Sequence, residues 1–222
     1  MIPRKWATIS MSALGVLGFL LVINESLKSL LITRMSRGDI VQTIGFRGNH
    51  SRPNDSNFDF SSVKPGNWKN TLKAWQSNTA GIGEIAIPSV RLKLPIYGGL
   101  NNENLLKGAG TMRANEQMGG GNYALASHHM ADPQILFSPL ARVQRGQRVY
   151  LTNNKCVYVY QVQSKKVISK YQVGYLKAMP HKRTLTLMTC LTASIGESKR
   201  ILVKGNFVYQ TKFSHRWFDL FR

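Results

Sequence analysis

Short runs of apolar residues, separated by glycine, asparagine and proline, dominate the chain from about residue 82 onwards. Runs of this length that are rich in valine, isoleucine, leucine and tyrosine predict β-strands. A tight hairpin turn is indicated within residues 151–157, where polar residues separate two such runs. The predicted strands cover residues 83–87, 90–96, 123–126, 148–151, 157–162, 185–189 and 200–209.

The spacing of these strands indicates the fold class. No long amphipathic helices alternate with them, which argues against a doubly wound α/β fold. Many short strands at modest spacing favour a mainly β domain that closes, or nearly closes, into a β-barrel. Short helices are expected at residues 103–107 and 134–136, and a further helical stretch at residues 67–77 precedes the barrel.

The N-terminal part follows a different pattern. Residues 6–23 are an unbroken run of apolar and small residues without a charge, about 27 Å long as a helix and so close to the thickness of a bilayer core. Because no small-x-small cleavage site follows, an uncleaved membrane anchor is favoured over a cleavable signal peptide. Basic residues on both sides leave its orientation open. Residues 36–66 have the composition of a spacer.

The charge of the chain is strongly one-sided. Lysine and arginine number 30 against 10 acidic residues, which gives a formal net charge of +20. Such a balance predicts attraction to polyanions, which include nucleic acid, anionic lipid headgroups and an anionic cell wall. The charge alone does not choose among them.

The two cysteines, Cys156 and Cys190, are too few for a disulfide framework, although one bond between them is possible. In the strand around residues 184–190, Leu185 and Leu187 share one face and Cys190 lies on the other. If the leucine face packs into the core, Cys190 is accessible at the end of its strand. Cys156 has no evident partner chemistry and is expected to be a small, partly buried apolar residue.

Other side chains supply what a reactive thiol lacks. Positive charge or a base favours the thiolate, and acyl transfer also needs a proton donor and a group that stabilises the oxyanion. Candidates are His128 and His129 at the end of one strand and Arg200 at the start of another. The histidine pair with Asp132 is a weaker candidate for a zinc site, because such a site needs further ligands.

Three segments together resemble one known family. Residues 185–190 (LTLMTC) are similar to the TLxTC signature of sortases, the Gram-positive transpeptidases that join surface proteins to the cell wall. Residues 124–130 (ALASHHM) look like the histidine segment of that family, and residues 200–205 (RILVKG) like its arginine strand. The segments occur in the family's order, and the resemblance covers about residues 81–211.

The resemblance implies a sortase-type closed β-barrel of about eight strands, with Cys190 as nucleophile, His128 as acid/base and Arg200 as the group that positions substrate and stabilises the oxyanion. The positions that match the family's sorting-signal groove are Ala126, Met188 and Thr189. Ser127 stands where many members have glycine, and residues 165–183, expected to form the loop over the groove, match no family motif.

The resemblance also implies a subclass and a domain plan. No second anchor and no aspartate-aromatic lid are evident, which favours a housekeeping, class A-like enzyme with no metal, calcium or other cofactor. The expected plan is a cytoplasmic tail at residues 1–5, a transmembrane anchor at 6–23, a spacer with possible helices at 24–80, the barrel at 81–211 and a basic aromatic tail at 212–222.

The implied activity is cleavage of an LPXTG-type sorting signal between Thr and Gly through a Cys190 thioester, followed by transfer to an amine of a lipid-linked cell-wall precursor. The catalytic domain would lie on the extracytoplasmic side of the membrane of a Gram-positive bacterium. The main alternative is a membrane-tethered basic module that binds wall polyanions or nucleic acid without catalysis. No nucleic-acid partner is expected, because no known nucleic-acid-binding signature appears. A thiol redox protein is a further alternative, but Cys156 and Cys190 do not form the CxxC pair typical of that class.

Overall fold

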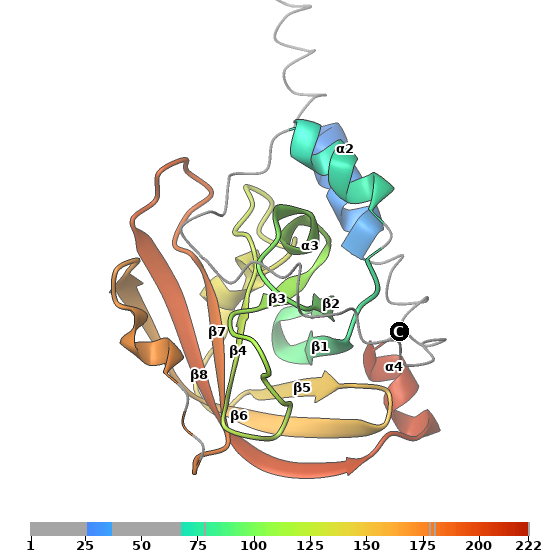
Figure 1. The fold of residues 1–222 in the computed structure, drawn as a ribbon, viewed down its shortest axis with the longest axis vertical. Coiled ribbons are helices and arrows are strands. Elements are labelled where there is room, and N and C mark those ends of the chain that lie inside the picture. Colours follow the sequence, from blue (N-terminus) through green and yellow to red (C-terminus); the bar gives the residue numbers. More distant parts are fainter. Residues whose placement is uncertain (1–25, 37–67, 78, 178, 180, 222) are drawn as a thin grey trace, which may run out of the picture.

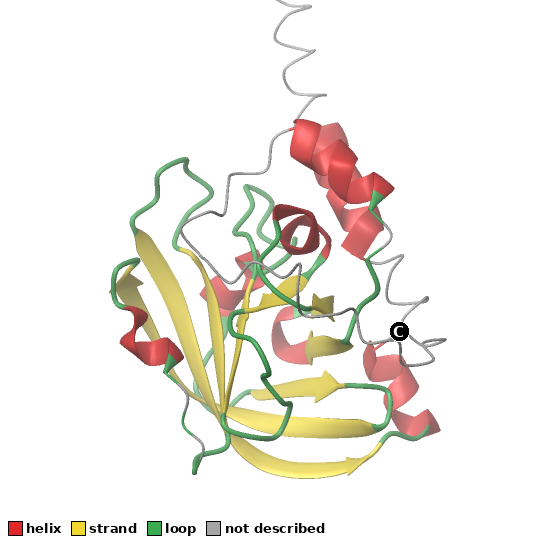
Figure 2. Cartoon of the chain, viewed as in Figure 1, coloured by secondary structure: helices red, strands yellow, loops and turns green. Residues whose placement is uncertain are grey.

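The computed structural model describes residues 26–36, 68–77, 79–177, 179 and 181–221. Within them the chain is mainly β, and its strands close one barrel (Figure 2), which confirms the predicted fold class. The predicted anchor at residues 6–23 and the predicted spacer from residue 37 onwards lie outside the described residues. No helix within the described ranges is both long and apolar enough to cross a bilayer.

The barrel has eight strands in the order β1-β2-β3-β4-β7-β8-β6-β5 (Figure 1). Most neighbours are antiparallel, but β2 pairs with β3 and β4 pairs with β7 in parallel. The parallel pairing of β4 with β7 matters most here, because it places two segments far apart in the sequence side by side. The strands are β1 (Gly83–Ile87), β2 (Leu92–Tyr97), β3 (Ala109–Thr111), β4 (Asn122–Ala126), β5 (Arg148–Thr152), β6 (Cys156–Ser169), β7 (Thr184–Cys190) and β8 (Lys199–Lys212).

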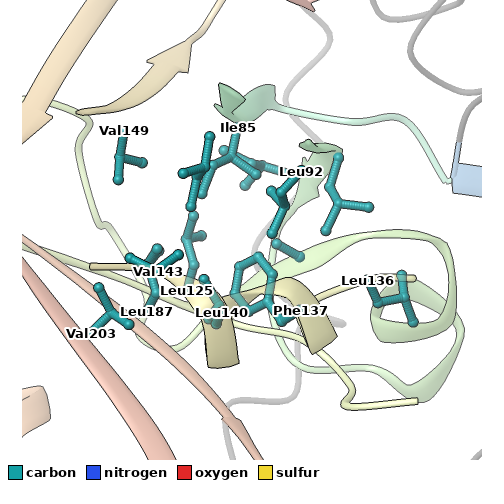
Figure 3. Packing of buried hydrophobic residues seen from close by; sticks show 14 of the residues in the cluster. Ile85, Leu92, Leu125, Leu136, Phe137, Leu140, Val143, Val149, Leu187 and Val203 are labelled. Atoms are coloured by element: carbon teal, nitrogen blue, oxygen red, sulfur yellow. The ribbon is translucent and has the colours of Figure 1, made fainter. Parts of the chain in front are cut away.

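Alternate side chains of the strands fill the barrel. Ile85 from β1, Leu125 from β4, Leu187 from β7 and Val203 from β8 are buried in one cluster, together with Phe137 from a connecting segment (Figure 3). Period-two alternation puts every second residue of each strand on the opposite face. The predicted core face of β7 is therefore confirmed, and Cys190 is on the face that points out of the barrel.

Several predicted elements differ from the structure. The short strand β3 was not predicted, because its three residues include no apolar run. The helix predicted at residues 134–136 is wrong: Leu136 has a positive φ of 51° and bridges to His129, and a 3-10 helix follows at Ser138–Arg142. Proline at position 139, early in that helix, suits its first turn. Strands β6 and β8 are longer than predicted, because their ends carry polar, exposed side chains that interrupt the apolar pattern.

Helices cover the barrel at several places. The predicted helices at residues 67–77 and 103–107 are confirmed as α2 (Trp68–Gln76) and α3 (Asn102–Lys107), and residues 26–36 are also helical. The C-terminal tail forms a 3-10 helix (His215–Trp217) and α4 (Phe218–Phe221). Phe221 is buried in a cluster with Ala86 of β1 and Val159 of β6. The tail therefore packs on an outer face of the barrel.

Candidate active site

The geometry of the site begins with the pairing of β7 and β8. In their antiparallel register, Cys190 at the end of β7 lies directly opposite Arg200 near the start of β8. Arg200 is only 8% exposed, and its guanidinium Nη1 donates hydrogen bonds to the carbonyls of Glu197 at 2.7 Å and Lys199 at 3.0 Å. The backbone thus holds a permanently charged, multi-donor group beside the thiol.

The environment of the thiol opposes its ionisation. Cys190 is half-buried, and this burial raises the pKa of its thiol. The positive charge of Arg200 lowers the thiol pKa and the carboxylate of Glu197 raises it, so that burial is only partly offset. The resting cysteine is therefore predominantly a neutral thiol at neutral pH.

His128 lies at the level of Cys190 on the neighbouring strand. Ala126 of β4 is the register partner of Met188 of β7, and the amide of Ser127 still donates to the carbonyl of Met188 at 3.3 Å. Two residues further along each chain come His128 and Cys190. The Nε2 atom of His128 is buried and has no hydrogen-bond partner among the described residues. Burial lowers the pKa of His128 to about 4, so the imidazole is neutral at pH 7 and can accept a proton.

A second histidine contacts the nucleophile segment directly. His129 Nδ1 lies 2.9 Å from the carbonyl oxygen of Cys190. Because a carbonyl can only accept, Nδ1 must carry the hydrogen in this contact. The hydroxyl of Thr189 in turn donates to the carbonyl of Ser127 at 2.9 Å. Together these bonds tie the end of β7 to the segment that leaves β4. The sequence showed only an adjacent pair of histidines, which could not reveal this contact.

The residues predicted to line the groove also lie near the thiol. Ala126 and Met188 belong to a second apolar cluster on the outward face of the sheet, and Tyr175 and Leu176 pack against this cluster. These two residues come from the connection between β6 and β7, which carries a 3-10 helix (Val173–Leu176) and appears beside β7 and β8 in Figure 1. Thr189 is fully buried. The predicted loop over the groove starts only after β6 ends, at about residue 170.

Two alternative chemistries find no support in the described residues. The thiols of Cys156 and Cys190 are both free, so a disulfide between them is not formed. No group of three or more His, Cys, Asp or Glu side chains among the described residues is placed to hold a metal ion.

A half-buried thiol, a neutral imidazole and a fixed guanidinium at adjoining strand ends form the side-chain set that acyl transfer through a cysteine needs. The Sortase domain family matches residues 85–208. The chain is 35% identical to sortase A of Streptococcus agalactiae over 90% of this chain and 83% of that protein. It is 35% identical to sortase A of Listeria monocytogenes over 79% of this chain and 80% of that protein.

The solved structures agree with the sequence comparison. The crystal structure of Listeria monocytogenes sortase A superposes with a TM-score of 0.62 and 36% identity, and covers 64% of this chain and 97% of that one. The chain therefore belongs to the sortase family, and it is a cysteine transpeptidase of the kind that anchors surface proteins.

Proposed function

We propose that this enzyme is a class A-like sortase that cleaves an LPXTG-type sorting signal between Thr and Gly, with Cys190 as nucleophile, His128 as acid/base and Arg200 as the oxyanion-stabilising group. The observation that carries the proposal is the direct cross-strand pairing of Cys190 with Arg200, with His128 level with them on the adjoining strand.

In the first half-reaction, the thiol proton of Cys190 passes to the His128 imidazole and the sulfur attacks the carbonyl carbon of the signal's threonine. The negative charge that develops on the carbonyl oxygen is stabilised by the Arg200 guanidinium. The C–N bond to glycine then breaks, and His128 returns its proton to the departing amine. A thioester between Cys190 and the threonine remains.

In the second half-reaction, an amine of a lipid-linked cell-wall precursor attacks the thioester. Its proton passes to His128 as the new amide bond forms, and then to the departing sulfur of Cys190. Both groups thereby return to their starting protonation states. Ala126 and Met188 belong to the surface along which the signal binds before the first step, and the buried Thr189 supports this surface through its hydrogen bond to the carbonyl of Ser127.

The proposed location is supported by the sequence and by the family. Residues 6–23 anchor the enzyme in the cell membrane of a Gram-positive bacterium, residues 24–80 form the spacer, and the barrel faces outward, where sorting signals and wall precursors meet. The unbroken apolar run supports the anchor. The alternative function, a basic binding module without catalysis, has no support from the comparisons.

The test is to trap the acyl-enzyme. The full chain in detergent is mixed with an LPXTG-type peptide, quenched in acid and measured by intact-mass spectrometry. A mass increase equal to the peptide up to its threonine, located on Cys190, is expected. Cys156→Ala is the matched control and should still form the adduct, whereas Cys190→Ala should not. Peptide transfer by the Cys190→Ala protein would refute the proposal.

A further inference from the structure

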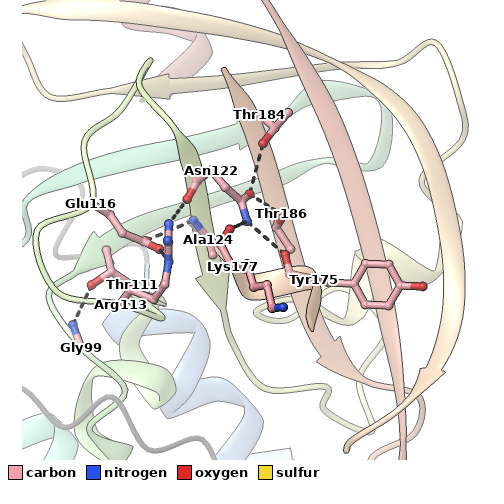
Figure 4. A network of polar contacts seen from close by, with 10 residues as sticks. All are labelled: Gly99, Thr111, Arg113, Glu116, Asn122, Ala124, Tyr175, Lys177, Thr184 and Thr186. Carbon is pink, nitrogen blue, oxygen red and sulfur yellow. Dashed lines mark hydrogen bonds and ion pairs between the residues drawn. The ribbon is translucent and has the colours of Figure 1, made fainter. Parts of the chain in front are cut away.

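A polar network beside the active-site sheet is centred on Asn122, the first residue of β4 (Figure 4). Asn122 is only 1% exposed. Its side-chain Nδ2 donates to the carbonyl of Tyr175 at 3.0 Å and to the carbonyl of Lys177 at 3.2 Å. Its Oδ1 accepts from the hydroxyls of Thr186 at 2.7 Å and Thr184 at 3.3 Å.

These contacts use the whole hydrogen-bonding capacity of the amide. An asparagine side chain offers two N–H donors and two acceptor positions on its oxygen, and each is engaged here. The orientation is also forced, because a flipped amide would bring Oδ1 against two backbone carbonyls that have no hydrogen to give. An aspartate of the same shape would face those carbonyls with a negative charge.

The two carbonyls belong to the wall segment, which we define as residues 170–177 between β6 and β7. Tyr175 and Leu176 in this segment pack on the apolar cluster that contains Met188, the neighbour of Cys190 on the same face of β7. The ammonium of Lys204 also lies 5.4 Å from the centre of the Tyr175 ring. The wall segment therefore packs directly beside the outward-facing residues Ala126 and Met188, which lie next to the Cys190 thiol.

The apolar support of the wall segment is limited to Tyr175 and Leu176, which are only partly buried. Tyr171 is 78% exposed and Val173 is 64% exposed. A segment that buries few apolar side chains depends more on its backbone hydrogen bonds for a fixed position. The bonds from Asn122 supply two of these, at carbonyls that lie two residues apart.

The other end of the network fixes Asn122 itself. The guanidinium of Arg113 donates to the backbone carbonyl of Asn122, and its Nε pairs with Glu116 at 2.7 Å. Glu116 also accepts from the amide of Ala124 at 3.1 Å. Strand β4, which leads to His128, and the wall segment are thus positioned from one residue.

We propose that Asn122 is a positioning residue that holds the wall segment against the surface beside Cys190 and thereby sets how tightly the sorting peptide binds. It does not touch the reacting atoms. The inference rests on the proposed function for its substrate, but its structural part, the tethering of the wall segment, can be tested without any peptide.

The test compares variants that differ by single atoms. Asn122→Asp removes both donors, Thr186→Val removes one donor to Oδ1, and Thr152→Val is the matched control. Thr152 is also fully buried and its hydroxyl also donates, to the carbonyl of Cys156 at 2.9 Å, but it lies at the β5–β6 hairpin away from the network. Hydrogen exchange of residues 170–177, KM and kcat for an LPXTG-type peptide, and alkylation of Cys190 by iodoacetamide are measured on the full chain.

We expect Asn122→Asp to raise KM about tenfold and Thr186→Val about threefold, with kcat changed less than about twofold, because uniform binding is lost and the chemical groups remain. Exchange in residues 170–177 should rise in both variants, and the alkylation rate of Cys190 should not fall. Thr152→Val should match the unaltered protein in exchange of residues 170–177.

Distinct outcomes separate the two proposals. If the unaltered protein does not process the peptide, the proposed function fails, while hydrogen exchange still decides the tethering. Unchanged exchange of the wall segment in Thr186→Val and Asn122→Asp would overturn the inference. So would a rise in exchange spread over the whole barrel, or an equal rise of KM in Thr152→Val, because either would mean that Asn122 only stabilises the fold. If Asn122→Asp does not fold, Thr186→Val decides alone.

Discussion

At the scale of single residues, the thiol and the imidazole are both neutral when no substrate is bound. Burial raises the pKa of Cys190 and lowers the pKa of His128 to about 4. The reactive thiolate is therefore a minor form at neutral pH, and the charge of Arg200 is the group in the site that increases its share. In the proposed mechanism, Arg200 would thus act on the thiol first, by lowering its pKa, and on the oxyanion afterwards.

This balance predicts a pH dependence for Cys190. Only the thiolate reacts with iodoacetamide, so the alkylation rate should rise with pH, with a midpoint above that of an unburied cysteine. Arg200→Gln removes a charge that lowers the thiol pKa, so its midpoint should move to still higher pH. The rate at pH 7 should fall about threefold to tenfold, since each unit of pKa changes the thiolate fraction tenfold.

The matched control for this prediction is Lys199→Gln, which removes an exposed positive charge from the neighbouring position and leaves the Arg200 guanidinium in place. Its alkylation profile should follow that of the unaltered protein. A profile for Arg200→Gln that does not move, or moves to lower pH, would contradict the assigned effect of Arg200.

Sequence reasoning pointed to the three side chains of the proposed mechanism but not to the groups that hold them. Cys190, His128 and Arg200 stand in short motifs at strand ends, where residue type and order are informative. Asn122 is different, because the proposed role depends on its two bonds to backbone carbonyls more than fifty residues further along the chain. Every residue type has a backbone carbonyl, so a contact to a carbonyl does not constrain which residue supplies it. The sequence therefore could not indicate the proposed positioning role of Asn122.

At the scale of elements, local patterns located most strands, and the missed ends of β6 and β8 have a common cause. Apolar runs marked the buried parts of β6 and β8, but the outer ends of these strands are stabilised by pairing with each other over a long ladder. The registers involve residues such as Lys166 and Lys212, whose side chains are exposed. Backbone hydrogen bonds do not require apolar side chains, so the pattern of apolar residues could not predict these strand ends.

The C-terminal tail provides a prediction at this scale. Phe221 of α4 is only 2% exposed and packs on the outer face of the barrel, and Tyr150 and Trp217 lie with their ring centres 5.9 Å apart nearby. Phe221→Ala should lower the free energy of unfolding by about 1.5–3 kcal/mol, the value of burying a large apolar side chain. Denaturant unfolding of the full chain measures this change.

Asp219→Ala serves as the control for the tail, because its side chain is exposed in the same helix. It should change the free energy of unfolding by less than about 0.5 kcal/mol. Equal stability of the Phe221→Ala and Asp219→Ala proteins would show that the tail does not contribute to the fold.

At the scale of the whole molecule, the net charge of +20 is far larger than the catalytic chemistry needs. We expect the chain to bind an anionic polymer such as heparin, with an affinity that falls about tenfold or more between about 0.05 and 0.2 M salt, because the attraction is electrostatic. Cys190→Ala should bind equally well. Affinity independent of salt would argue against this charge effect, and equilibrium binding at several salt concentrations provides the measurement.

The parallel pairing of β4 with β7 also bears on the stage of folding at which the active site is assembled. It joins segments 62 residues apart, and Arg200 arrives only with the strand after them. Contacts between such distant segments form late, because a long loop must close first. A partly synthesised or partly folded chain therefore contains the proposed catalytic histidine and thiol before the strand that carries Arg200 has paired beside them. Barrel closure is therefore the step that brings the three proposed catalytic groups together, and a chain that has not reached it lacks the side-chain arrangement that the proposed thioester chemistry needs.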